Sequence, residues 1–255
     1  MKNNKQQVLH LLESIETWDT TPISYINPDK YIQHNQWVKD GLAGFGELLS
    51  KLPEGGAKVK TMRVFQDGDF VFTHTDYDFF GPKIGFDVFK FEDGKIVEHW
   101  DNLQETVTAT VSGRTMIDGP TEVTDVDKTE ENRELITNMI HDIFLWANPG
   151  KITEYFSTQT YNQHNPMVAD GLNAFGTALK GLAEAGTPMI FTKNHKILVE
   201  WNFAMTITEW EFLWKHVSFY DLFRIENGKI VEHWDTIENI KIDSEALNTN
   251  WKFNF

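Results

Sequence analysis

The eight residues GKIVEHWD occur twice in the chain, once in each half. Each copy places a histidine two residues before an aspartate, as His99 with Asp101 and as His233 with Asp235. Alternate side chains of a β-strand point to the same face, so each pair is expected to face one pocket. An imidazole and a carboxylate on one wall of an apolar cavity can act as general acid and general base, moving a proton next to a carbonyl group.

A second repeat lies upstream of each of these motifs. The segment YIQHNQWVKDGLAGFG aligns with YNQHNPMVADGLNAFG, and the histidines of the two segments are His34 and His164. The two repeats occur in the same order and at nearly equal spacing, which indicates a tandem duplication. Chain length allows it, because each half is long enough to bury its own core.

Each copy has a helical pattern first and a strand pattern afterwards. Apolar residues at helical spacing follow the QHN motif, and stretches rich in Val, Phe, Thr, Trp and Ile begin at about Val59 and Met189. Helices followed by antiparallel strands predict an α+β fold. The segment SGRTMIDGPTEVTDVD lacks periodicity, so we expect a linker there and two domains, 1–118 and 119–255.

The turns FEDGKI and IENGKI set which residues face the histidines. A type I turn with a bulge at Gly94 would place His99 opposite Asp87. The same register would place Asp221 beside His233 in the second copy. Each pocket would then contain two aspartates and one histidine.

Composition restricts the partners. The chain has 23 basic and 38 acidic residues and a net charge of −15, which argues against binding to nucleic acid or to anionic membranes. Without cysteine it has no thiolate nucleophile and no thiolate metal site. It contains neither a signal-peptide pattern nor a segment that could span a bilayer, so we expect a cytoplasmic location.

Helices before a late antiparallel sheet, an early YIQHN…DG and a late GKIVEHWD resemble the nuclear transport factor 2-like (NTF2-like) superfamily. Within it they resemble the SnoaL-like branch of polyketide cyclases and predicted aldol-condensation enzymes. The resemblance covers both halves and nearly the whole chain. It implies two cone-shaped α+β domains, each with helices over the concave face of its sheet. It also implies that the two domains pair as a pseudo-dimer inside one chain; further oligomerisation is left open.

The resemblance also implies roles for the repeated residues. The late hairpin is similar to that of ketosteroid isomerases, where the position of Asp87 and Asp221 holds a pocket carboxylic acid. A SnoaL-like enzyme would use Asp101 or Asp235 for proton transfer and orient it with the neighbouring histidine.

The histidines of the QHN motif would sit near the mouth of each cone, where His34 or His164 would steady an enolate oxygen. The implied reaction is of aldol, cyclase, isomerase or dehydratase type on a small apolar carbonyl compound. It needs no cofactor and no metal.

Several other interpretations stay open. The chain could be a non-catalytic small-molecule-binding or scaffold protein with the same fold. The EHWD residues could form a network that holds the sheet, and Asn35 and Asn165 could cap a helical turn. The H-x-D spacing also occurs in iron sites, for which His34 or His74 would be a third ligand. The two copies differ at one of these possible ligand positions, where His74 of the first copy aligns with Ile207 of the second.

Overall fold

The structure is a computed structural model that describes residues 3–52, 57–187 and 189–255. Contacts divide the chain into two compact units. Unit 1 contains Met1–Thr106 and Ile240–Phe255, and unit 2 contains Val107–Asn239. The domain boundary at 118/119 marks where the sequence repeat restarts, and it stays a prediction. The contacts instead assign residues 107–118 to unit 2 and residues 240–255 to unit 1.

The segment that follows the last strand of each unit belongs to the other unit. The linker arm, residues 107–118, follows the last strand of unit 1 and packs within unit 2. The C-terminal arm, Ile240–Phe255, follows the last strand of unit 2 and packs within unit 1. Each unit is thus completed by the segment that follows the other unit's last strand.

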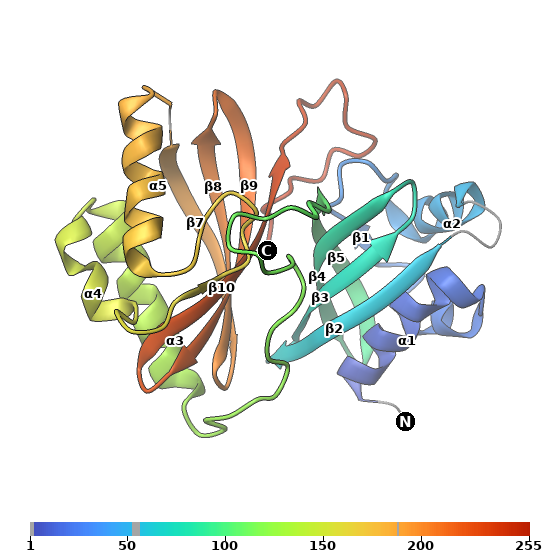
Figure 1. The fold of residues 1–255 in the computed structure, drawn as a ribbon. Coiled ribbons are helices and arrows are strands. Elements are labelled where there is room, and N and C mark those ends of the chain that lie inside the picture. The colour runs from blue at the N-terminus through green and yellow to red at the C-terminus, as the bar shows by residue number, and fades with distance from the viewer. Residues whose placement is uncertain (1–2, 53–56, 188) are drawn as a thin grey trace. The chain divides into compact units, whose positions relative to one another are not determined.

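Apart from the two-residue strand β1, the helices of unit 1 precede its strands (Figure 1). Its elements are α1 (Asn4–Thr17), the 3-10 helix η1 (Thr21–Tyr25), β1 (Ile32–Gln33), α2 (Gly41–Lys51), β2 (Lys58–Asp67), β3 (Phe70–Asp78), β4 (Pro82–Glu92) and β5 (Lys95–Glu105). The sheet order is β1-β5-β4-β3-β2. Only β1 pairs in parallel, with β5, among the described strands of this sheet.

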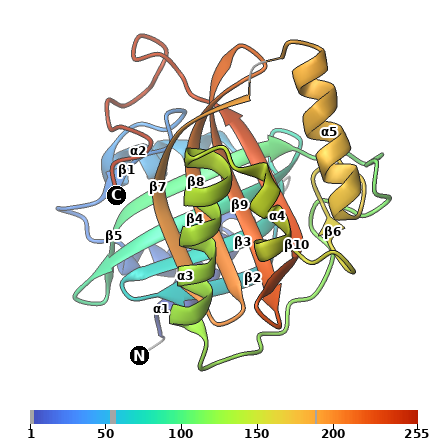
Figure 2. The same ribbon diagram turned by 90° about the vertical axis from the view of Figure 1, so that its left-hand side faces the viewer.

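Unit 2 repeats this order. Its elements are α3 (Thr129–Met139), the π-helical η2 (Ile140–Leu145), the 3-10 helix η3 (Pro149–Lys151), α4 (Ile152–Tyr155), β6 (Asn162–Gln163), α5 (Leu172–Glu184), β7 (Met189–Glu200), β8 (Phe203–Phe212), β9 (Lys215–Glu226) and β10 (Lys229–Asn239). The sheet order is β6-β10-β9-β8-β7, and α3 and α4 lie over one face of it (Figure 2). The α+β fold class with two tandem helix-on-sheet units is confirmed.

Each unit has its own core between helices and sheet. In unit 1, Val8, Leu11 and Leu12 form the buried stripe of α1, whose first turn is closed by a capping box between Asn3 and Gln6. In unit 2, Ile136 and Met139 of α3 are buried in the same way. None of the helices in the described ranges is long and apolar enough to cross a membrane.

The hairpin between β4 and β5 corrects the predicted register. Glu92 pairs with Lys95, so the turn has only two residues, both with positive φ: 49° at Asp93 and 74° at Gly94. These angles fit a type I′ turn, which requires no bulge at the glycine. The register shifts further along, where Val97 is an extra residue on β5.

Because of this shift, the expected pairing of His99 with Asp87 is wrong. Asp87 lies opposite Asp101, and His99 lies opposite Phe89. The hairpin of unit 2 is the same, since Asp221 pairs with Asp235. A two-residue change in pairing keeps every side chain on the predicted face, so the three residues still meet.

Candidate functional site

Three titratable side chains converge on one face of the sheet in unit 2. Asp221 comes from β9, and His233 and Asp235 come from β10. His233 Nε2 lies 2.9 Å from Asp221 Oδ1, and each residue offers an atom within 4.8 Å of the other two. The structure therefore brings together the aspartates and the histidine expected from the repeat.

Two side-chain amides complete this cluster. The sequence motifs predict a role in the site for neither of them. Strand β6 runs parallel to β10 and sets Gln163 beside His233. Gln163 Oε1 accepts from the backbone N–H of Asn165 at 3.0 Å and lies 2.8 Å from His233 Nδ1. Asn165 Nδ2 donates to Asp235 Oδ2 at 2.6 Å. The available signal was that the Q and N of YxQHN are repeated together with the histidine.

The amide of Gln163 fixes one proton of His233. Its oxygen must accept, because a backbone N–H already donates to it, so His233 Nδ1 carries a hydrogen. Burial lowers the pKa of His233, but the hydrogen bond to Asp221 and the charges of Asp235 and Asp221 outweigh it and raise the pKa above its usual value. The site therefore favours the imidazolium form more than water does.

Asp235 is the carboxyl group best suited to exchange a proton. Burial and the nearby charge of Asp221 raise its pKa to about 6, although His233 and the amide of Asn165 act against them. Its Oδ1 is buried and has no hydrogen-bond partner among the described residues. A buried, unpaired carboxylate oxygen is unfavourable, so this atom has a strong tendency to bind a proton.

Replacing Gln163 by leucine should lower the pKa of His233, because Nδ1 would lose its acceptor while burial remains. Nitrogen NMR of the imidazole against pH would measure the change. Leucine in place of the exposed Gln159 is the control. An unchanged titration of His233 in Gln163→Leu would show that the amide does not set its protonation.

The cluster forms the polar part of a cavity of about 540 Å³. That volume is within the usual range for small-molecule sites. The rest of the lining is largely apolar and aromatic, and it includes Phe144, Phe175, Trp210, Phe212, Phe219 and Phe223. The only charged or titratable groups among these lining residues, apart from the hydroxyl of Tyr161, are the three members of the cluster.

Unit 1 repeats the cluster with Asp87, His99 and Asp101. His99 Nε2 lies 3.1 Å from Asp87 Oδ1, and His99 Nδ1 lies 3.1 Å from Gln33 Oε1. Asn35 Nδ2 donates to Asp101 Oδ2 at 2.6 Å. The duplicated motif thus builds the same polar arrangement twice.

One position distinguishes the two clusters. In unit 1 the hydroxyl of Tyr77 donates to Asp87 Oδ2 at 2.7 Å. Trp210 occupies the corresponding position of unit 2, and its ring N–H donates to Thr208 rather than to a carboxylate. Tyr77 also lies over Gly85, where an added Cβ would come within 2.8 Å of its ring. Asp87 is therefore more fully hydrogen-bonded than Asp221.

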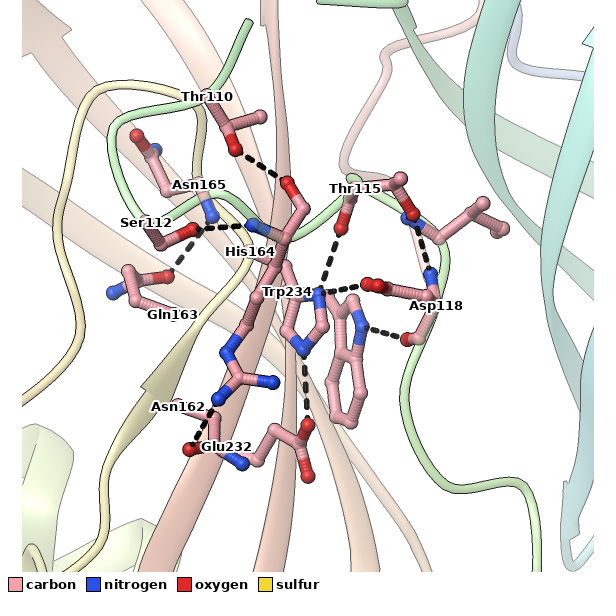
Figure 3. A network of polar contacts seen from close by, with 12 residues as sticks. Thr110, Ser112, Thr115, Asp118, Asn162, Gln163, His164, Asn165, Glu232 and Trp234 are labelled. Carbon is pink, nitrogen blue, oxygen red and sulfur yellow. Dashed lines mark hydrogen bonds and ion pairs between the residues drawn. The ribbon is translucent and has the colours of Figure 1, made fainter. Parts of the chain in front are cut away.

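The histidines of the QHN motif do not lie at the pocket mouth, so this prediction is wrong. His164 is buried on the other face of the sheet and stacks on Trp234 with ring centroids 4.6 Å apart (Figure 3). Its Nε2 lies 2.9 Å from Glu232, and its Nδ1 lies 2.7 Å from the carbonyl oxygen of Thr115 in the linker arm. Both ring nitrogens of His164 therefore contact oxygen atoms of the protein.

His34 has the same environment in unit 1. It stacks on Trp100 at 4.4 Å, its Nε2 lies 3.1 Å from Glu98, and its Nδ1 lies 2.9 Å from the carbonyl oxygen of Trp251 in the C-terminal arm. His34 and His164 therefore hold the arms rather than an enolate oxygen. In each EHWD motif, Glu and Trp contact the buried histidine of the QHN motif on one face of the sheet. His and Asp belong to the cluster on the other face.

The asparagine of the QHN motif has two roles. Asn165 Oδ1 accepts from the backbone N–H of Met167 at 2.8 Å, and Asn35 does the same for Trp37 at 2.7 Å. Each asparagine thus closes a local turn, as the capping alternative expected, although the helices begin later, at Gly41 and Leu172. The amide nitrogen of each asparagine also donates a hydrogen bond to Asp101 or Asp235 of the cluster.

The proposed third ligand of an H-x-D metal site is also misplaced. His34 lies on the other face, and His74 faces Arg63, with 3.1 Å between their nitrogens, while stacking on Phe86. The third group beside each H-x-D pair is instead Asp87 or Asp221. A metal at either cluster would have to replace the hydrogen bond between that aspartate and the histidine.

No protein-family model matches the chain, and no curated protein matches it. Similar solved structures include an NTF-2 like protein of unknown function from Burkholderia xenovorans, with 15% identity over 42% of this chain and 86% of that one and a TM-score of 0.36. They also include IdmH, a candidate polyketide cyclase from Streptomyces antibioticus, with 16% identity over 39% and 90% and a TM-score of 0.33. An LEH-like epoxide hydrolase of M. tuberculosis has 20% identity over 39% and 81% and a TM-score of 0.34.

Each of these matches spans less than half of this chain and most of the other. That is the coverage expected when one of two tandem units aligns with a single-domain protein. Part of the chain thus resembles NTF2-like proteins in fold, as the sequence predicts. At these identities and TM-scores the likeness extends to nothing beyond the fold.

Proposed function

We propose that unit 2 catalyses proton transfer next to the carbonyl group of a small apolar compound, without a cofactor. The observation that carries this proposal is Asp235, a buried carboxyl group with a pKa of about 6 and an unpaired oxygen in the wall of an apolar cavity. A carboxyl group with a pKa close to the working pH both accepts and returns protons efficiently.

In the proposed step, the carboxylate of Asp235 removes a proton from the carbon beside the carbonyl. The electrons of the broken C–H bond move to the carbonyl oxygen and form an enolate. Asp235 then returns the proton to another atom of the same compound, which is an isomerisation. Alternatively, the enolate carbon attacks a second carbonyl, as in aldol cyclisation, and the alkoxide that forms takes the proton back from Asp235. No oxidant or reductant is needed.

Tyr161 is the proposed donor to the enolate oxygen. It lines the cavity and is buried, and its oxygen accepts a hydrogen bond from Gln163 Nε2 at 3.4 Å. Burial, together with the charges of Asp221 and Asp235, raises the pKa of Tyr161 well above its usual value, so it keeps its proton. A buried hydroxyl donor stabilises a developing oxyanion in a site that excludes water.

A non-catalytic ligand-binding protein is the second candidate. It is favoured by the way the cluster satisfies itself, since His233 is bonded to Asp221 and Gln163, and Asp235 to Asn165. The apolar cavity alone would then provide the affinity.

Hydrogen exchange into simple ketones separates the two candidates without knowledge of the natural substrate. A panel of cyclic and linear ketones in D2O, followed by proton NMR, should show deuterium entering beside the carbonyl in the presence of the protein. Asp235→Asn should slow the exchange by at least about 100-fold, Tyr161→Phe should reduce it, and the matched variant Asp101→Asn in unit 1 should retain it. If ketones stabilise the protein but acquire no deuterium, the catalytic proposal fails and the binding protein remains.

A further inference from the structure

The opening of the unit 2 cavity is apolar. Of the residues that line it, the exposed ones are Met167, Gly181 and Leu213, so the cavity meets solvent there. Met167 is 76% exposed and Leu213 is 45% exposed, and Trp214 next to it is 71% exposed. The polar cluster, in contrast, is largely buried. We call Met167, Leu213 and Trp214 the apolar rim.

Part of the rim is held in an unfavourable backbone conformation. Leu213 and Trp214 form the two-residue turn between β8 and β9, with φ of 52° and 59°. Such turns favour Asn or Asp followed by Gly, as in Asn227–Gly228 at the next hairpin. Residues with a Cβ are disfavoured in this left-handed conformation. Large apolar side chains kept at a strained, exposed tip indicate a functional constraint.

The duplicate has exposed apolar residues at two of the three rim positions, whereas Gly81 stands at the position of Trp214. Trp37 corresponds to Met167 after the QHN motif and is 59% exposed. Phe80 corresponds to Leu213 at the tip of the β3–β4 hairpin and is also 59% exposed. Solvent exposure alone gives no reason to keep large apolar side chains at both positions in both copies.

We infer that the ligand of unit 2 is a single-chain amphiphile, which deepens the proposed function and rests on it. Its carbonyl head lies at Asp235, and its unbranched apolar chain leaves the cavity over the rim. This arrangement pairs the few polar groups of the cavity with the polar end of the ligand. It also covers Met167 and Leu213, which a ligand confined to the cavity would leave in water. The acidic chain disfavours an anionic head group.

A series of methyl ketones from 2-butanone to 2-undecanone tests this inference by binding alone, through titration calorimetry on the full chain. The dissociation constant should fall by about fourfold per added methylene, the equivalent of about 0.8 kcal/mol, up to the longest members. The double variant Leu213→Asn with Trp214→Gly keeps a favourable turn and removes the rim side chains. It should bind 2-butanone like the wild type and 2-undecanone about tenfold more weakly. Phe80→Asn in unit 1 is the matched control and should leave the constants measured for unit 2 unchanged.

The outcomes separate this inference from the proposed function. Dissociation constants that stop falling at short chains, or a double variant that binds 2-undecanone as tightly as the wild type, would overturn the amphiphile while deuterium exchange could still proceed. Normal chain-length dependence without exchange would retain the amphiphile and remove the catalysis. If no ketone of any length binds, both proposals fall.

Discussion

Asp235→Asn should lower the rate of proton exchange beside a carbonyl by at least about 100-fold, because general acid–base catalysis contributes about 10²–10⁴-fold. Asparagine can still accept the hydrogen bond from Asn165, but it cannot bind and release a proton. Ligand affinity should therefore survive while turnover is lost. Calorimetric titration with a ketone, beside the deuterium exchange rate, measures both in the same samples.

The same substitution should change how stability depends on pH. The pKa of Asp235 is about 6 in the folded protein, above the value near 3.8 of an ordinary aspartate. The folded state thus holds this proton more tightly, and stability from this group is lost as the pH rises from about 4 through about 6. The loss is roughly 3 kcal/mol, from about two pKa units at 1.36 kcal/mol each.

The raised pKa of His233 acts in the same direction at higher pH. Its contribution is complete below about 6.5 and is lost as the pH rises through the folded value. Asparagine at 235 removes the aspartate part, so urea unfolding at pH 4.5 and 7.0 should show a smaller decrease for the variant. A variant several kcal/mol less stable than the wild type at pH 7, with Asp101→Asn behaving alike, would instead identify a purely structural network.

Removal of the C-terminal arm, by ending the chain after Asn239, should unfold unit 1 and leave unit 2 folded. The arm stacks Phe255 on Trp100 at 4.5 Å, and the buried Lys252 Nζ donates to the carbonyl oxygen of Asp101 at 3.1 Å. Asn248 Nδ2 donates to the carbonyl oxygens of Asn35 and Val38. Several such hydrogen bonds at about 1 kcal/mol each, with the buried aromatic area, amount to on the order of 5 kcal/mol. That is comparable with the whole stability of a small domain.

Scanning calorimetry and the tryptophan NMR signals would follow the two units separately. A synthetic peptide of residues 240–255, added to the shortened chain, should restore the lost transition. Ile242→Ala, at an exposed position of the arm, is the control and should melt like the wild type. A shortened chain with unchanged melting would mean that the arm contributes little to unit 1.

The repeat made much of this structure predictable. The alternation of strand side chains correctly places His99 with Asp101, and His233 with Asp235, on one face of each sheet. The error in the hairpin turn does not change this result, because it shifts the strand pairing by two residues. The same alternation explains the error at His34. The resemblance places His34 near the mouth of the cone, but Gln33 belongs to the short parallel strand β1 and faces the cluster, so its neighbour His34 faces the other way.

The arms were beyond prediction for a different reason. The linker arm has no regular apolar period, and of its apolar residues only Met116 is buried, whereas Val107 and Val111 are exposed. The local sequence does not indicate which unit buries such a segment. The linker arm is held through backbone atoms, such as the carbonyl oxygen of Thr115, which contacts His164 from a distant part of the chain. The raised pKa of Asp235 likewise depends on burial and on charges brought by other strands.

The grouping of the arms also sets the order in which the chain can finish folding during synthesis. Unit 2 is one continuous stretch, whereas unit 1 takes residues from both sides of it. At roughly 5–20 residues per second, the ribosome synthesises all of unit 2 before it synthesises the segment that covers Trp100 and His34. The half that is made first is therefore completed last, and its uncovered aromatic face is the surface that a chaperone would meet on the nascent chain.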